Sequence, residues 1–351
     1  MTIIHGQPGA DGARRNGKYR ILSLDGGGLR TLLSIGLLKR IDQLRPGFLD
    51  QVDLVAGTSA GAISALIIAA AREPAVGLEQ ARQLWLTHEL FHSSLRTRLG
   101  AIIGMNALTP SKNMARALTH ILGDKTLGDL KRKVVIPAFK LDDENPDENR
   151  REWKPRVFHN FPGADFVNPG DRLVDLALRS SSLPIVSPVY QGYVDGGLFA
   201  NNPTMAAVAQ AIYAKAADLR DLLVFSQGAG DMVHYLKGYN ENWGWWKWLL
   251  NSKLPWALVD IAVAAGVEAI DFQAKRLLPR GNYWREDPRV PSHLGNSVEA
   301  QVVTLDQIVE KHDLSEALEW VDSSGWLPKG MHEAASGAQP ELSGESGEAR
   351  S

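Results

Sequence analysis

The sequence predicts an α/β protein whose mainly parallel central sheet is covered by helices. Short apolar runs alternate with longer helical patterns between residues 19 and 226, which is the order that successive strand and helix units produce. Glycine-rich segments at 25–28 and 57–61 each separate a strand pattern from a helix pattern, as turns between such elements do. Together these observations indicate a layered α/β fold.

Each predicted element follows from its local pattern. The predicted strands are short apolar runs at residues 19–24, 52–56, 133–141, 156–159 and 222–226. The predicted helices are longer segments at residues 29–45, 60–72, 78–89, 111–122, 173–179 and 204–217. The segment 142–151 is highly charged and contains a proline, so we expect a solvated loop that joins two strands.

Residues 57–61 read Gly-Thr-Ser-Ala-Gly, between an apolar run and a segment rich in Ala, Ile and Leu. A sharp strand-to-helix turn of this kind holds a serine hydroxyl at its tip, and glycines on both sides let backbone and substrate approach closely. Ser59 is therefore the candidate nucleophile, supported by Gly57 and Gly61. The same pentapeptide also occurs at ordinary turns, so the motif alone is a hypothesis.

A second glycine cluster, DGGGLR at 25–30, follows the first predicted strand and opens a helix. Consecutive glycines at a helix N-terminus can point several N–H groups at one anionic oxygen, and the helix dipole adds partial positive charge. Gly26, Gly27 and Gly28 are therefore candidates for an oxyanion hole. A phosphate-binding turn and a plain tight connection are the alternatives.

The third element is Asp195, which follows an apolar segment and precedes Gly196 and Gly197. An aspartate at a strand end can face a cleft. Asp-Gly is also a frequent turn dipeptide, so this segment gains weight only together with the other two motifs.

In their order and spacing, the three motifs resemble those of the patatin-like phospholipase family. The segment 192–203, GYVDGGLFANNP, is similar to the family's segment around its catalytic aspartate. The resemblance spans about residues 19–284, and it implies a three-layer α/β/α sandwich with a patatin-like catalytic domain.

By the same resemblance, Ser59 is the nucleophile of a Ser-Asp dyad and Asp195 is its base. Gly26, Gly27 and Gly28 match the family's oxyanion-hole glycines, and Arg30 matches the arginine that follows them.

The chemistry of ester cleavage agrees with these assignments, because it needs a nucleophile, a proton acceptor and donors for the developing oxyanion. An aspartate with an ordinary pKa near about 4 is a weak base for a serine hydroxyl, so we expect a sheltered Asp195. Ser59 would form an acyl-enzyme. Asp195 would return the proton to the leaving alcohol and then activate water.

Two other chemistries compete with this interpretation. In a Ser-His-Asp triad, His234 or His293 would follow the acid in chain order, but neither follows a clear strand pattern. A dinucleotide-binding turn fits poorly, since Thr31 stands where the third glycine of the fingerprint would fall. The histidines show no zinc-binding spacing, and we predict no metal and no cofactor.

The motifs occupy the first 200 residues and imply one catalytic domain rather than two. We predict a flexible N-terminal segment at 1–18 and a catalytic domain at 19–330 with an elaborated C-terminal part at 230–330. Residues 331–351, rich in Gly, Ser, Glu and Ala, are predicted to be a disordered tail.

The composition agrees with a soluble enzyme of ordinary character, with 44% hydrophobic residues, 22% charged residues, a net charge of −2 and no cysteine. Disulfides are excluded, and no nucleic-acid partner is predicted. The N-terminus has no apolar core of a signal peptide and the chain has no run of about twenty apolar residues. We expect a cytoplasmic protein; peripheral membrane association and secretion without a cleaved signal both stay open.

Half of the ten tryptophans lie at residues 243–256 beside lysines and leucines. Tryptophans in such company favour a membrane interface, so Trp243, Trp245, Trp246 and Trp248 are candidates for peripheral membrane contact. The alternative is that these rings pack a helix against the sheet, as large aromatic side chains usually do.

The sequence thus supports a lipid acyl hydrolase whose substrates are phospholipids, lysophospholipids, galactolipids or simple acyl esters. The alternative is a storage, binding or signalling protein that retains the fold, because fold does not fix function. Ser59, Asp195, the glycines and Arg30 are all intact, which favours the enzyme. An activating partner leaves no identifiable mark in the sequence.

Overall fold

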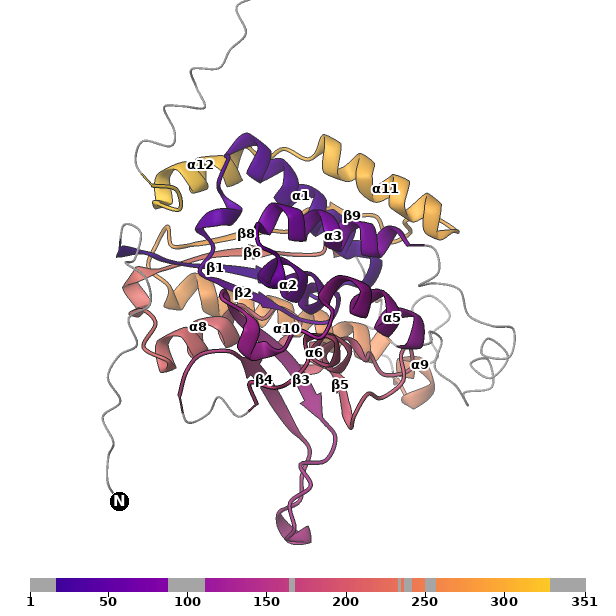
Figure 1. Cartoon of the computed structure of the whole chain (residues 1–351). Helices are drawn as coiled ribbons and strands as arrows, with labels where there is room; N and C mark the ends of the chain where they lie inside the picture. Colours follow the sequence, from indigo (N-terminus) through magenta and orange to yellow (C-terminus); the bar gives the residue numbers. More distant parts are fainter. Residues whose placement is uncertain are drawn as a thin grey trace, which may run out of the picture.

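The computed structural model describes residues 17–87, 111–163, 168–232, 235–236, 242–249 and 257–328. Its centre is a seven-stranded sheet of order β4-β3-β2-β1-β6-β8, in which β5 pairs with β3 (Figure 1). The strands are β1 (Tyr19–Leu24), β2 (Leu54–Gly57), β3 (Lys133–Lys140), β4 (Lys154–His159), β5 (Tyr193–Asp195), β6 (Leu222–Gln227) and β8 (Tyr283–Glu286). A separate two-stranded sheet pairs β7 (Asp231–Met232) with β9 (Arg289–Val290).

The sheet is mainly parallel, as predicted. β1 pairs in parallel with β2 and β6, and the parallel arrangement continues to β3 and β8. Only β4 and β5 run antiparallel to β3. The carboxyl ends of the parallel strands therefore meet at one edge of the sheet, where ligands bind in open α/β sheets.

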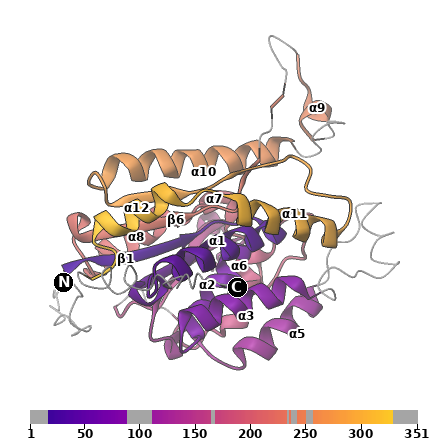
Figure 2. The ribbon, with the colours of Figure 1, turned by 90° about the horizontal axis from the view of Figure 1, so that it is seen from above.

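Helices cover both faces of the sheet. One face packs against α1 (Thr31–Leu44), α2 (Ala60–Ala70), α3 (Pro74–Leu86), α5 (Ser111–Leu122), α6 (Leu173–Ser181), α11 (Val298–Lys311) and α12 (Ser315–Ser324). The other face packs against α8 (Thr204–Tyr213) and α10 (Ala257–Leu277). Figure 2 shows α10 on one side of β1 and β6 and α2 and α3 on the other. This is the three-layer α/β/α arrangement.

Successive side chains of each strand point to opposite faces of the sheet and therefore pack against different helix layers. Ile21 and Val224 belong to the apolar cluster on the α8 and α10 side, and their neighbours Leu22 and Phe225 belong to the larger cluster on the opposite side. All four side chains are fully buried. Because both faces are covered, the strands read as continuous apolar runs, as expected for a parallel sheet.

Several predicted boundaries differ from the structure. The helix predicted at 78–89 begins at Pro74, which occupies the first turn, a position that suits proline because its missing N–H has no intrahelical partner there. The helix predicted at 204–217 ends at Tyr213, since Lys215 adopts a left-handed conformation with φ 57° that a helix cannot continue through. The predicted loop 142–151 joins β3 to β4 in a hairpin that projects from the body of the molecule (Figure 1).

No elements were predicted beyond residue 226, where the structure forms β8, α10, α11 and α12. α10 lacks a clean apolar stripe because it is exposed along much of its length, which explains why periodicity did not reveal it. Residues 1–16 and the predicted tail at 331–351 lie outside the described residues. No helix within the described ranges is long and apolar enough to span a membrane.

Candidate active site

Ser59 lies between the end of β2 and the start of α2, at the tip of a sharp turn. Its backbone adopts φ 56° and ψ −124°, which is a strained conformation for a residue with a side chain and a marker of functional turns. Its N–H donates a hydrogen bond of 3.1 Å to Ser180 Oγ. The Thr58 hydroxyl beside it donates to the Ala200 carbonyl at 2.6 Å.

The glycines on either side of Ser59 allow the turn to pack against neighbouring backbone. A β-carbon on Gly61 would lie 2.4 Å from the carbonyl oxygen of Leu24, and one on Gly57 would lie 2.2 Å from the carbonyl oxygen of Gly61. A side chain at either position would force the neighbouring backbone to shift. The start of α2 therefore lies directly against the end of β1, beside the DGGGLR segment.

Asp195 is the last residue of β5 and is 1% exposed, so the expected shelter of this carboxylate is confirmed. Its Oδ1 accepts a 2.7 Å hydrogen bond from the Gly197 N–H. Its Oδ2 is buried without a partner of standard hydrogen-bond geometry among the described residues, but the Ser59 hydroxyl lies close enough to favour the charged carboxylate. Catalytic hydrogen bonds commonly tighten only when substrate binds.

Burial raises the pKa of Asp195 from 3.8 to about 6, against the opposing effects of the Ser59 hydroxyl and the Gly197 N–H. A carboxylate in this range is a better proton acceptor than an exposed aspartate and is still ionised at neutral pH.

The Gly26–Gly28 segment lies alongside Ser59. A β-carbon on Gly26 would be 3.1 Å from the Ser59 Cβ and 2.3 Å from Asn201 Oδ1. The Gly26 N–H donates to the Asn201 carbonyl at 3.0 Å. Within the described ranges, the N–H groups of Gly27 and Gly28 donate no backbone hydrogen bond, which leaves these two as the loop's available donors.

The other predicted residues, Arg30, Gly196 and Gly197, contact the backbone segments that surround Ser59 and Asp195. Arg30 donates a 2.7 Å hydrogen bond to the Gly230 carbonyl and thereby holds the turn after β6. Gly196 approaches β3 so closely that a β-carbon would lie 2.3 Å from the Pro137 carbonyl oxygen. Gly197 begins the short helix α7 (Gly197–Ala200) and supplies the N–H that binds Asp195.

Ser180, near the end of α6, contacts the candidate site and was not predicted from the sequence. Its hydroxyl accepts from the Ser59 N–H and donates to the Pro137 carbonyl at 2.6 Å, and its own carbonyl accepts from the Gly196 N–H at 3.2 Å. One residue thus connects the Ser59 turn, β3 and the segment after Asp195. No local motif marks it, because its role depends on where α6 packs.

The histidines considered for a triad do not gain support. His293 is exposed, and His234 lies outside the described residues. In the part of the chain that the structure describes, no group of three or more His, Asp and Glu side chains could hold a metal ion.

Comparison with known proteins finds a family model and several relatives that match this chain. The sequence model of the family described as "Patatin-like phospholipase" matches residues 22–208. Across 327 residues the chain is 28% identical to CotR of Bacillus subtilis, a match that covers 88% of this chain and 98% of that protein. It is similarly 28% identical to the protein teg of Priestia megaterium, over 87% of this chain and 98% of that protein.

A third relative carries an activity in its name. The chain is 33% identical over 229 residues to a cGAMP-activated phospholipase of Vibrio cholerae, which covers 59% of this chain and 61% of that protein.

Proposed function

Because this chain belongs to the family of patatin-like phospholipases, we propose that it cleaves acyl esters of lipids through Ser59 and Asp195. Membership of this family supports lipid acyl hydrolase activity. The observation that carries this proposal is the Ser59 hydroxyl, held on a strained turn, close to the buried Asp195 carboxylate, whose Oδ2 has no hydrogen-bond partner of standard geometry among the described residues. The available N–H groups of Gly27 and Gly28 lie on the neighbouring loop.

In this mechanism Asp195 accepts the Ser59 proton as the hydroxyl attacks the ester carbonyl. The carbonyl oxygen becomes an oxyanion that the loop N–H groups stabilise, a contribution worth about 3 kcal/mol per donor. Collapse releases the alcohol, which takes the proton from Asp195, and leaves Ser59 acylated. Asp195 then deprotonates water for deacylation, and the fatty acid leaves.

The first test measures fatty-acid release from phospholipids, lysophospholipids, galactolipids and short acyl esters. Ser59→Ala and Asp195→Asn are expected to lower release by about 10⁴-fold or more. Ser64→Ala is the matched control, because Ser64 is a buried serine of α2 whose hydroxyl, among the described residues, donates to the Ala60 carbonyl of its own helix and to no other group. Full activity in Ser59→Ala would contradict the proposal.

Each substrate is assayed with and without a cyclic dinucleotide, because relatives are named cGAMP-activated and cUMP-AMP-activated phospholipases. Release that depends on the dinucleotide would assign this chain the same kind of activator. If folded wild type releases no fatty acid under either condition, the proposal is withdrawn: the chain then either needs a different activator or is a storage, binding or signalling protein on this fold.

We further propose that the substrate is reached through a membrane contact at α9 (Trp245–Leu249). Trp245 is 67% exposed, which contradicts core packing for this ring. The rings of Trp243 and Trp248 lie edge to face at 5.0 Å, and Lys247 Nζ lies 5.4 Å from the Trp243 ring centre. An exposed tryptophan with partly buried aromatic rings and a lysine beside it suits the headgroup level of a bilayer.

The position of α9 supports this contact. It lies apart from the layers, at the end of the molecule to which the carboxyl ends of β1 and β6 point (Figures 1 and 2). The Trp246 side chain and Trp256 lie outside the described residues.

Bilayers of phosphatidylcholine with brominated acyl chains should quench the fluorescence of wild type. Trp245→Ala should reduce activity on these vesicles several-fold and spare a soluble ester such as p-nitrophenyl butyrate. Trp153→Ala is the matched control, because Trp153 is also strongly exposed but lies in the β3–β4 hairpin. Equal loss on vesicles and soluble ester would contradict the membrane role.

A further inference from the structure

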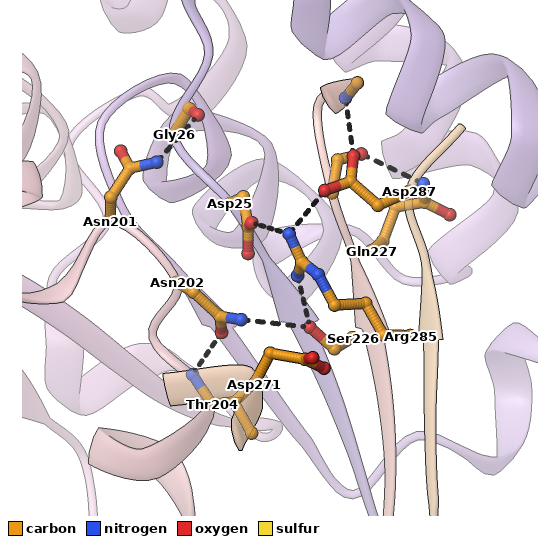
Figure 3. Close-up of polar contacts among 12 residues, drawn as sticks. Asp25, Gly26, Asn201, Asn202, Thr204, Ser226, Gln227, Asp271, Arg285 and Asp287 are labelled. Atoms are coloured by element: carbon orange, nitrogen blue, oxygen red, sulfur yellow. Dashed lines mark hydrogen bonds and ion pairs between the residues drawn. The ribbon is translucent and has the colours of Figure 1, made fainter. Parts of the chain in front are cut away.

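Arg285, at the end of β8, is a buried charged residue that the proposed mechanism does not use. Its side chain is 9% exposed. One guanidinium nitrogen, Nη2, donates to Asp25 Oδ2 at 2.8 Å and to Asp287 Oδ2 at 2.6 Å, and the other, Nη1, donates to Ser226 Oγ at 2.9 Å. Figure 3 shows the guanidinium between the two carboxylates.

Asp25 connects this network to the N-terminal end of the glycine loop, because it immediately precedes Gly26. It is 3% exposed, and its N–H donates to the Gln227 carbonyl at 3.0 Å. The loop therefore begins from a residue that is held on its backbone by β6 and on its side chain by β8.

Asp287 connects the same guanidinium, through Gly230, to Arg30 at the C-terminal end of the loop. Its Oδ1 accepts a 2.8 Å hydrogen bond from the Gly230 N–H, and the Gly230 carbonyl accepts from Arg30. The turn that contains Gly230 also packs on the loop itself, since a β-carbon on Gly27 would lie 2.3 Å from the Ala229 Cβ.

The opposite charges in this network offset part of the cost of burying them. Burial disfavours the Arg285 charge, but Asp25 and Asp287 raise its pKa above the ordinary value. Burial raises the pKa of Asp25 to about 6, and Arg285 opposes that shift. A buried ion pair of this kind adds little net stability compared with apolar packing, but it can specify one arrangement of the groups that it joins.

We propose that Arg285 is a positioning residue of the oxyanion loop, which holds the Gly27 and Gly28 N–H groups beside Ser59 through Asp25 at one end and Asp287 at the other. The inference rests on the proposed ester hydrolysis, because the loop matters only if an oxyanion forms there. Donors for an oxyanion must be held in place before reaction to be effective, and Arg285 joins both anchors of the loop.

The experiment separates the number of working sites from the rate at each site. Wild type, Arg285→Lys and Arg285→Met are titrated with a fluorophosphonate that labels Ser59, and kcat and KM for p-nitrophenyl butyrate are then expressed per labelled site. Arg285→Met should lower kcat per site by about 10- to 100-fold, approaching the loss of one oxyanion donor. KM should change little, and Arg285→Lys should recover part of the rate.

Val321→Ala is the matched control for lost stability. Val321 is fully buried in α12, and this helix lies on the opposite side of the molecule from α9 (Figure 1). This variant should reduce the number of labelled sites on warming and leave kcat per site unchanged. If Arg285→Met behaves in the same way, Arg285 serves the fold alone and the inference is overturned. A raised KM at unchanged kcat would also overturn it.

Asp25→Asn gives a second route if Arg285→Met does not fold, because Arg285 stays paired with Asp287 in that variant. It should lower kcat per site several-fold. In the double variant with Arg285→Lys, the two losses should be less than additive, since both act on one link; fully additive losses would contradict the link. Failure of wild type to label at Ser59 would instead remove the proposed function, and with it this role for Arg285.

Discussion

At the scale of single residues, the proposed chemistry depends on the environment of Asp195. Its carboxylate is buried at the end of β5 with one N–H donor and the Ser59 hydroxyl beside it. Burial opposes ionisation, and this opposition both makes the carboxylate a stronger base and lowers the stability of the folded chain when the group is ionised.

We predict that kcat/KM on p-nitrophenyl butyrate falls as the pH is lowered through about 6, because only ionised Asp195 can accept the Ser59 proton. The Asp25 carboxyl titrates in the same range, so the profile is measured in wild type and in Asp25→Asn. If Asp195 sets the midpoint, both proteins share it. A flat profile between pH 5 and pH 8 in a chain that stays folded would contradict the assignment of Asp195 as base.

The same shift predicts that Asp195→Asn stabilises the inactive protein. The folded-state pKa of Asp195 is raised, so between 3.8 and about 6 the folded chain binds a proton that the unfolded chain has lost, and stability falls as pH rises through that window. Removing the buried charge should increase the free energy of unfolding at neutral pH by about 1–3 kcal/mol. Urea denaturation should show this gain at neutral pH and its disappearance below the ordinary carboxyl pKa of 3.8.

At the scale of elements, the site depends on the close contact between α2 and the end of β1. That contact is backbone against backbone, because Gly61 has no side chain and lies against the carbonyl groups of Leu24 and Asp25. The helix that follows Ser59 and the strand that leads into the glycine loop are thereby placed at one fixed separation.

We predict that Gly61→Ala destabilises the chain by about 1–3 kcal/mol through overpacking and lowers kcat by moving Ser59 away from the loop. Gly266→Ala is the matched control within α10, where an added β-carbon meets nothing within 4 Å. It should stabilise the chain by about 0.5–1 kcal/mol through helix propensity and leave kcat unchanged. Thermal unfolding and ester hydrolysis of both variants would check the pair of outcomes.

At the scale of the whole molecule, the segment after α12 packs against the first strand and against Phe48. Trp326 is fully buried, stacks on Phe48 with ring centres 5.0 Å apart, and donates from Nε1 to the Phe48 carbonyl at 3.0 Å. Arg20 of β1 is 1% exposed and donates to the carbonyls of Trp326 and Gly325. The last described segment is therefore part of the main core.

We predict that Trp326→Ala lowers the free energy of unfolding by about 3–5 kcal/mol, as expected for a large aromatic side chain removed from a core. Loss of circular dichroism and loss of Ser59 labelling should coincide along a urea titration, because the segment and the sheet unfold together. Two separated transitions would contradict this cooperative closure.

The sequence alone determined the central part of the fold and the composition of the site. The helix 111–122 and the strand 19–24 have the same bounds in the sequence prediction and in the structure, because each has a continuous local pattern with clear ends. The three motifs were sufficient to identify Ser59, Asp195 and the glycine loop as candidates, since a turn that exposes a hydroxyl or N–H groups requires glycines at fixed spacing.

Only the tertiary structure decided how these residues meet and what holds them. Ser180, Asn201 and Arg285 reach the site from α6, from the end of α7 and from β8, and none of them was predicted to belong to it. Their roles arise from contacts between segments as much as 260 residues apart, such as Asp25 and Arg285. Local propensity carries no information about such contacts, because they depend on how complete layers pack.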